Sequence, residues 1–197
     1  MAEAVLDPRL RVDWLDRDEL ADDRPGRLGM TFLPGKRGKS TRYAGRVYRR
    51  ELDRDLATLR EASVRSVLLL VDDGELARFG DSDIVERGAA DGIIIERRPL
   101  TDGTAPASPA EMDEILALIE DARSRGDVAV ACMGGVGRTG TVVACALVAA
   151  GVGASDAIAR VRQVRHPEAV ETEEQVMFVE AYERHMDRGA SSSRVAR

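Results

Sequence analysis

Apolar residues follow two periods along the chain, and each period favours a different element. Leucines recur at helical spacing within residues 50–61, and the apolar run 67–71 ends at two aspartates, as a buried strand does. A second pair follows, with a short helix near residues 83–90 and a strand at 93–95. Helices that alternate with strands are typical of an α/β domain with a mostly parallel sheet.

The clearest helix start lies at Ser108-Pro109-Ala110-Glu111, where a serine N-cap, a proline at the first helical position and a glutamate form a capping box. The predicted buried face of this helix consists of Ile115, Leu118, Ile119 and Ala122. Further along, the pattern predicts a strand at 128–131 and helices at 141–150, 155–164 and 173–186. We therefore expect a three-layer α/β sandwich, with a central, mostly parallel sheet flanked by helices.

Length and composition favour one domain with two loosely held ends. The chain has 197 residues, of which 44% are hydrophobic, enough for a single buried core. Residues 1–25 are acidic and irregular, and residues 187–197 carry no apolar face. The sequence predicts a flexible N-terminal segment over 1–25, a domain over 26–186 and a disordered tail over 187–197.

Charge and cysteine content exclude several classes of protein. Charged residues make up 32% of the chain and are evenly spread, with a net charge of −6, so we expect no nucleic-acid partner. The two cysteines, Cys132 and Cys145, form no disulfide framework or metal-binding pair, and no metal or other cofactor is expected. The N-terminus has no signal-peptide pattern and no apolar run reaches transmembrane length, which predicts a cytoplasmic protein without a membrane partner.

A glycine-rich loop joins the predicted strand 128–131 to the apolar helix after it. Backbone N–H groups at a helix N-terminus bind phosphate well, and glycines let the backbone approach closely. The sequence therefore predicts a phosphate-binding loop, with the helix dipole favouring a negative charge on the thiol at its start. Its residues are Met133, Gly134, Gly135, Val136, Gly137 and Arg138.

Three side chains in and beside this loop are candidates for catalysis. A thiolate at Cys132 can attack phosphorus. Arg138, six residues later, offers a planar guanidinium that takes two phosphate oxygens at once and follows them into the transition state. Thr139 can donate its hydroxyl to the sulfur and stabilise the thiolate as a leaving group, or it can serve as an ordinary hydroxyl in the first helical turn.

The loop, with Cys-x5-Arg followed by Thr-Gly in VACMGGVGRTG, resembles the protein tyrosine phosphatase superfamily, in particular its dual-specificity and kinase-associated-phosphatase-like branch. Weaker similarity extends over residues 27–180, through stretches at 29–36, 99–103 and 170–172. The resemblance implies a cysteine-dependent phosphomonoester hydrolase with a phosphocysteine intermediate. It favours a phosphorylated protein as substrate, with a small sugar or nucleotide phosphate as the alternative.

The same resemblance implies two further roles. Such phosphatases use an aspartic acid about thirty residues before the cysteine to protonate the leaving oxygen, and Asp102 stands thirty residues before Cys132. Asp102-Gly103 also has the pattern of a simple turn. Gln175 lies where relatives often carry a glutamine that positions the hydrolytic water, although residues 172–175 also read as a capping box in which Gln175 only satisfies a helix end.

Other functions remain to be weighed against this one. The family normally has a histidine before the cysteine, whereas this chain has Ala131, so a relative that binds phosphate without hydrolysing it is an alternative. Residues 135–140 also match the dinucleotide-binding pattern G-x-G-x-x-G, but the region about twenty residues on is helical in pattern rather than a strand ending in an acidic residue. A Walker A loop fails because Gly-Lys-[Ser/Thr] is missing.

Several polar residues have ordinary interpretations. The basic cluster Lys36, Arg37 and Lys39 is expected to be solvated loop charge, with contact to an anionic substrate as the alternative. Asp72 and Asp73 are expected to line a pocket or to make a turn. We expect His166 and His185 to lie at the surface and Cys145 to be a buried apolar residue.

Overall fold

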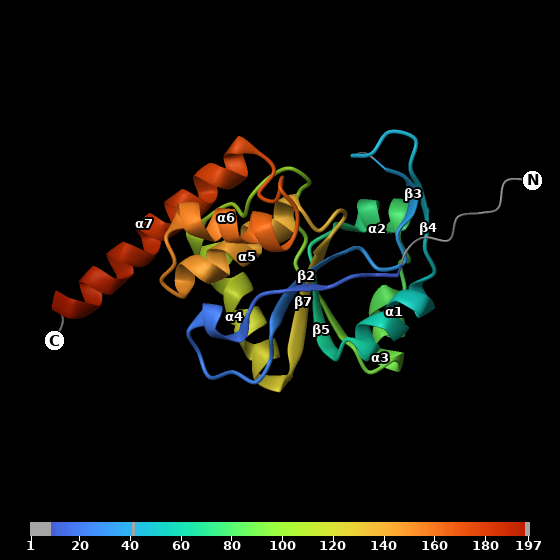
Figure 1. Cartoon of the computed structure of the whole chain (residues 1–197), viewed down its shortest axis with the longest axis horizontal. Helices are drawn as coiled ribbons and strands as arrows, with labels where there is room; N and C mark the ends of the chain where they lie inside the picture. Colours follow the sequence, from blue (N-terminus) through green and yellow to red (C-terminus); the bar gives the residue numbers. More distant parts are fainter. Residues whose placement is uncertain (1–8, 41, 196–197) are drawn as a thin grey trace, which may run out of the picture.

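The computed structural model describes residues 9–40 and 42–195, and within them a five-stranded sheet forms the centre of the molecule (Figure 1). The strand order is β1-β2-β7-β5-β6, and β1 alone among these strands runs antiparallel to its neighbour. The strands are β1 (Asp13–Trp14), β2 (Leu28–Phe32), β5 (Val64–Leu69), β6 (Ile94–Arg97) and β7 (Asp127–Cys132).

Helices cover both faces of the sheet, which confirms the expected three-layer α/β architecture (Figure 1). One face carries α1 (Leu52–Glu61), α2 (Asp73–Phe79) and α3 (Ile84–Ala90). The other carries α4 (Pro109–Arg125), α5 (Gly137–Ala149), α6 (Ala154–Val164) and α7 (Glu173–Val195). A short 3-10 helix η1 (Arg17–Leu20) and a hairpin of β3 (Arg37–Lys39) and β4 (Val47–Arg49) lie outside these layers.

Strand β7 separates the two halves of the hydrophobic core. All its residues are buried, because it lies between β2 and β5 and has helices on both faces. Val128, Val130 and Cys132 pack into the cluster around α5, while Ala129 and Ala131 face the cluster around α1, as the two-residue period of a strand requires. The apolar helix α5 follows directly and is buried on nearly all sides.

Most predicted helices and strands are present, with shifted boundaries. Ser108 caps α4 by accepting a hydrogen bond from the Glu111 backbone N–H, and Pro109 is its first residue. The buried face of α4 differs slightly from the prediction, because Leu118 is half-buried while Met112 and Leu116 are buried. The strand expected at 67–71 spans 64–69, and the one expected at 93–95 spans 94–97. Strand β2, the hairpin and α2 were not predicted.

Both chain ends contribute more structure than predicted. Residues 9–25, which were predicted to be irregular, contain β1, which pairs with β2, and Leu10 and Leu15, which are buried in the core. Residues 1–8 lie outside the described part of the chain. At the other end, α7 continues to Val195 instead of ending near residue 186. Of the helices described, none has the length and apolar character needed to cross a membrane.

A buried ion pair fixes the loop between β2 and β3. The Arg50 guanidinium donates to both carboxylate oxygens of Asp55, at 2.8 and 2.6 Å, and the Gly35 backbone N–H donates to Asp55 at 2.9 Å. The two charged side chains are 4% and 2% exposed. Removing one partner of such a pair leaves the other charge uncompensated in the interior.

Replacing Asp55 with alanine is therefore expected to lower the free energy of unfolding by about 3–5 kcal/mol, measured by chemical denaturation. Asp53→Ala is the matched control, because Asp53 is exposed and its pair with Arg87 lies at the surface, where such pairs contribute about 0–1 kcal/mol. Equal losses in the two variants would contradict this role for Asp55.

Candidate active site

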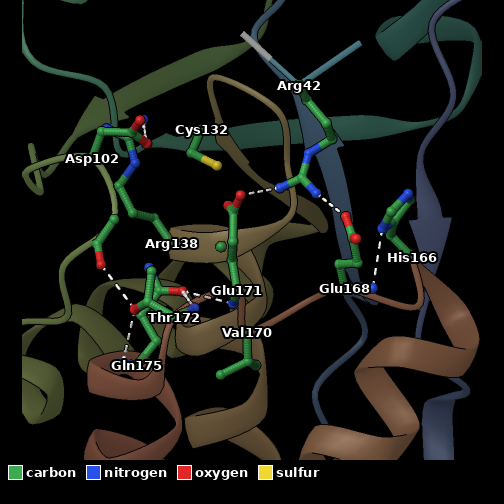
Figure 2. A network of polar contacts seen from close by, with 12 residues as sticks. Arg42, Asp102, Cys132, Arg138, His166, Glu168, Val170, Glu171, Thr172 and Gln175 are labelled. Atoms are coloured by element: carbon green, nitrogen blue, oxygen red, sulfur yellow. Dashed lines mark hydrogen bonds and ion pairs between the residues drawn. The ribbon is translucent and has the colours of Figure 1, made fainter.

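The residues singled out by the sequence meet at the edge of the sheet where the parallel strands end. Cys132 is the last residue of β7, Arg138 lies in the first turn of α5, and Asp102 lies in the loop between β6 and α4. Asp102 Oδ1 is 2.8 Å from Arg138 Nη2. Figure 2 shows these three side chains together. The carboxyl ends of strands in open α/β sheets are the usual location of ligand sites.

The loop after Cys132 turns tightly around the cysteine sulfur. The Gly135 backbone N–H donates to Cys132 Sγ at 3.2 Å, and the thiol is 3% exposed. Gly135 has a φ of 65°, and a Cβ at this position would lie 2.2 Å from the carbonyl oxygen of Thr31. Only glycine fits here, because any side chain would collide with strand β2. The loop passes through Met133 to Val136 and enters α5 at Gly137.

Arg138 is held in a buried position by several acceptors. Its side chain is 1% exposed and donates to both Glu75 carboxylate oxygens, at 2.6 and 2.7 Å, and to the Leu100 carbonyl at 2.8 Å. Burial by itself lowers the pKa of Arg138, but the hydrogen bonds that Arg138 donates to Glu75 and the nearby charges of Cys132 and Asp102 outweigh it and hold the pKa above its ordinary value. The guanidinium is therefore a fixed positive charge beside the thiol.

One nitrogen of Arg138, Nε, has no partner among the residues that the structure describes. Its Nε is buried and makes no hydrogen bond with the described residues, while the adjacent Nη2 contacts the exposed carboxylate of Asp102. Nε and Nη2 form the edge of the guanidinium that takes two oxygens of a phosphate. Asp102 therefore occupies one of the two positions that a phosphate oxygen would take at Arg138.

The sequence allows two roles for each of Thr139 and Gln175, and Gln175 makes the capping contact that one of its roles requires. The Thr139 hydroxyl is buried without a hydrogen-bond partner among the described residues, so its expected hydrogen bond to Cys132 is not formed. Gln175 forms the capping box with Thr172, at 3.2 and 3.4 Å, and also donates to the Thr104 carbonyl at 3.0 Å. It thereby connects α7 to the loop that carries Asp102 (Figure 2).

Glu75 and Arg165 support the site, although no motif in the sequence indicated a role for either residue. Glu75 follows strand β5 in the first turn of α2 and binds Arg138 as described above. Arg165, at the end of α6, donates to the carbonyls of Gly135 at 2.8 Å and Gly134 at 3.2 Å, and pairs with Asp13 of β1 at 2.6 Å. Its side chain is 8% exposed. The contacts of Arg165 hold the loop from the side of α6. Ala131, the residue before Cys132, has no polar group with which to hold the loop.

The basic cluster and Asp72 are the first of the weaker candidates to compare with the structure. Lys36 is not solvated loop charge as predicted but is 6% exposed and lines the cavity at Cys132, while Arg37 and Lys39 are exposed. Asp72 makes the N-cap of α2 and is absent from the cavity wall.

His166 lies at the cavity rim beside the Tyr43 hydroxyl, and His185 pairs with Asp113 on the surface. Burial raises the pKa of Cys145, which is fully enclosed in α5. Among the described residues, no group of three or more His, Cys, Asp or Glu side chains is placed to hold a metal ion.

Comparison with known proteins decides the family. The family model described as "Polymorphic toxin system, DSP-PTPase phosphatase" matches residues 44–152, more than half of the chain. The chain belongs to this family of dual-specificity cysteine phosphatases. The part matched to the DSP-PTPase model contains Glu75, Asp102, Cys132 and Arg138, and leaves out Lys36 and Arg165.

Individual proteins agree with the DSP-PTPase assignment. The chain is 28% identical over 160 residues to cyclin-dependent kinase inhibitor 3 of Sus scrofa, covering 79% of the chain and 71% of that protein. Its fold matches that of a kinase-associated phosphatase carrying serine for its catalytic cysteine, with a TM-score of 0.76, 23% identity, and coverage of 92% and 98% of the two chains. It is also 30% identical to Tk-PTP, with a TM-score of 0.63 and coverage of 81% and 92%.

The role of Arg165 in holding the loop can be tested by phosphate binding, which does not depend on turnover. Arg165→Met removes both hydrogen bonds to the loop carbonyls, so the loop loses its fixed shape and binding of inorganic phosphate is expected to weaken about tenfold, measured by calorimetry. Arg160→Met, on the same helix, is the control, because Arg160 pairs with Asp16 and Glu19 away from the cavity. Unchanged phosphate affinity in a folded Arg165→Met protein would contradict the supporting role.

Proposed function

We propose that the chain is a cysteine-dependent phosphomonoester hydrolase that acts on phosphorylated proteins through a phosphocysteine intermediate. The observation that carries the proposal is the meeting of three groups in one place: a buried thiol, a fixed guanidinium 1% exposed, and a carboxylate 2.8 Å from that guanidinium. Each group matches one requirement of phosphoryl transfer, namely a nucleophile, a positive charge for the phosphate oxygens and a proton donor.

In the first step, Arg138 takes two phosphate oxygens through Nε and Nη2, and Asp102 gives up its contact with Nη2. The approaching dianion favours the protonated form of the displaced carboxyl group. The Cys132 thiolate then attacks phosphorus, so that an S–P bond forms while the P–O bond to the leaving group breaks. Asp102 delivers its proton to the leaving oxygen, and the phosphoryl group stays on the sulfur.

In the second step, water attacks the phosphocysteine and Asp102 accepts the proton that the water loses. The S–P bond breaks, inorganic phosphate forms and Cys132 returns as a thiolate. Gln175 reaches the loop, because a Cβ on Gly137 would lie 3.1 Å from its side-chain oxygen. A role in placing the water is compatible with this position, in addition to its capping role.

A phosphoprotein substrate is favoured by two observations. One of the solved structures similar to this chain is named a kinase-associated phosphatase. The cavity at Cys132 has a volume of about 1150 Å³, which is more than one phosphate group or a small sugar phosphate fills. Both cysteines are unpaired, and reducing conditions protect a thiolate nucleophile from oxidation, so we propose that the protein acts in the cytoplasm.

The nucleophile is tested by turnover of a generic aryl phosphate in the presence of a chelator. The wild-type protein is expected to be active, and Cys132→Ser to be inactive while still binding phosphate, because a serine hydroxyl at this position is a far weaker nucleophile. Cys145→Ala is the matched control and should keep its activity. Wild-type protein that binds phosphate without any turnover would instead support a binding module.

The proton donor is tested with leaving groups of different basicity. Asp102→Ala is expected to lower kcat/KM, which reports the steps up to departure of the leaving group, by about 10²- to 10⁴-fold on an alkyl phosphate, and by much less on a nitrophenyl phosphate, whose oxygen leaves without a proton. Asp73→Ala, an exposed aspartate at the same sheet edge, should leave both rates unchanged. An equal effect of Asp102→Ala on both substrates would remove it as the acid.

A further inference from the structure

The cavity at Cys132 extends well beyond the phosphate-binding loop. One side of it is formed by the β3–β4 hairpin, which contributes Arg42, Tyr43, Arg46 and Tyr48, and by Lys36 just before β3. Phosphate itself is accounted for by the loop and Arg138. The cations on the hairpin side are therefore available for another part of the substrate.

Lys36 is a buried lysine with an aromatic neighbour. Its side chain is 6% exposed and its Nζ lies 4.2 Å from the centre of the Tyr48 ring. The backbone around it is fixed, because Gly35 donates to the buried Asp55 and the Arg50 N–H donates to the Lys36 carbonyl at 3.1 Å. The ammonium group is thus held in place at the cavity wall rather than moving freely in solvent.

A second cation shares the same ring. The Arg46 guanidinium lies 4.8 Å from the centre of Tyr48, and its positive charge lowers the pKa of Lys36. Within the described ranges, neither Lys36 nor Arg46 has a carboxylate within ion-pair distance. Two like charges beside one ring repel each other, and an anion between them would relieve that repulsion.

The other arginines of the cavity wall are already engaged, Arg9 by Glu61 and Arg11 by Asp13. Arg42 pairs with Glu168 and Glu171, as Figure 2 shows, and Arg165 pairs with Asp13. Arg162 donates to the backbone carbonyls of Ala169 and Val170. Lys36 and Arg46 differ from these arginines, because both lie over the Tyr48 ring and neither side chain makes a hydrogen bond or an ion pair with the described residues.

The pKa of Lys36 responds to burial and to the charges around the side chain. Burial, together with the positive charges of Arg46 and Arg42, lowers the pKa of Lys36 to about 8, although the charges of Cys132 and Asp102 act in the opposite direction. At neutral pH the group is still mostly charged. An anion beside it would favour the charged form, so binding would raise the pKa again.

We propose that Lys36 and Arg46, on the ring of Tyr48, bind a second anionic group of the substrate next to the phosphate held at Cys132. The substrate is then a phosphopeptide in which a residue beside the phosphorylated one is acidic or itself phosphorylated. This proposal rests on the proposed function, since it places the cleaved phosphate at Cys132.

The test compares two phosphopeptides that differ only in the flanking residue, alanine in one and glutamate in the other. Wild-type protein is expected to show a kcat/KM about tenfold higher for the acidic peptide, the effect of one charge-assisted contact. Lys36→Met keeps an apolar chain over Tyr48 and should remove the preference. Lys39→Met is the matched control, because Lys39 is the other lysine of the chain, is exposed and lies outside the cavity wall.

A second variant and a binding measurement keep the test decisive in two cases: if Lys36→Met does not fold, and if the protein hydrolyses no phosphomonoester. If Lys36→Met does not fold, Arg46→Gln replaces an exposed side chain and should reduce the preference about threefold. If no phosphomonoester is hydrolysed, the proposed function fails, but the peptide preference can still be measured as Kd on Cys132→Ser by fluorescence anisotropy, where the same tenfold ratio is expected.

Three outcomes would overturn the second anion site. The first is equal kcat/KM and equal Kd for the two peptides in the wild-type and Cys132→Ser proteins. The second is an equal loss on both peptides in Lys36→Met, which would mean that Lys36 serves the cleaved phosphate. The third is a Lys36-dependent preference for a small bisphosphate over a monophosphate without any preference between the peptides, which would remove the phosphopeptide from the proposal.

Discussion

The site depends on the burial of one positive charge, the guanidinium of Arg138. A charge that is 1% exposed is stable only when acceptors surround it, and the fold supplies them from separate segments. Glu75 comes from the helix after β5, the Leu100 carbonyl and Asp102 from the segment after β6, and Arg138 itself from the helix after β7. The same contacts that stabilise the guanidinium therefore bring the loop that carries Asp102 to the thiol.

The phosphate-binding loop is supported from outside as well as from within. Arg165 binds two carbonyls of the loop and is itself held by Asp13, so the short strand β1 near the N-terminus has a direct effect on the shape of the site. The contacts of Arg165 matter because Ala131 stands where the family normally has a histidine, so residue 131 gives the loop no polar contact. Its methyl group lies in the core on the opposite face from Cys132, while the polar contacts to the loop come from α6.

The sequence predicted the parts whose signals are local. The loop from Cys132 to Arg138, the cap at Ser108 and the apolar helix α5 are all encoded within a few neighbouring residues. The parts it missed depend on distant partners: β2 contains Gly29 and Thr31 and lacks a regular apolar pattern. Glu75 and Arg165 resemble ordinary surface charges until the fold places them beside the loop. Lys36 was predicted as solvated for the same reason, since its burial depends on Tyr48 and on the pair between Arg50 and Asp55.

The central claim, that Cys132 takes the phosphoryl group from the substrate, is tested most directly by trapping that intermediate. A radiolabelled aryl phosphate would be mixed with the protein, the reaction stopped within milliseconds by denaturant, and the digested protein searched for label by mass spectrometry. The account predicts one labelled peptide, the one containing Cys132, with label that appears and decays at the rate of turnover. Turnover with no label on that peptide would contradict the cysteine mechanism.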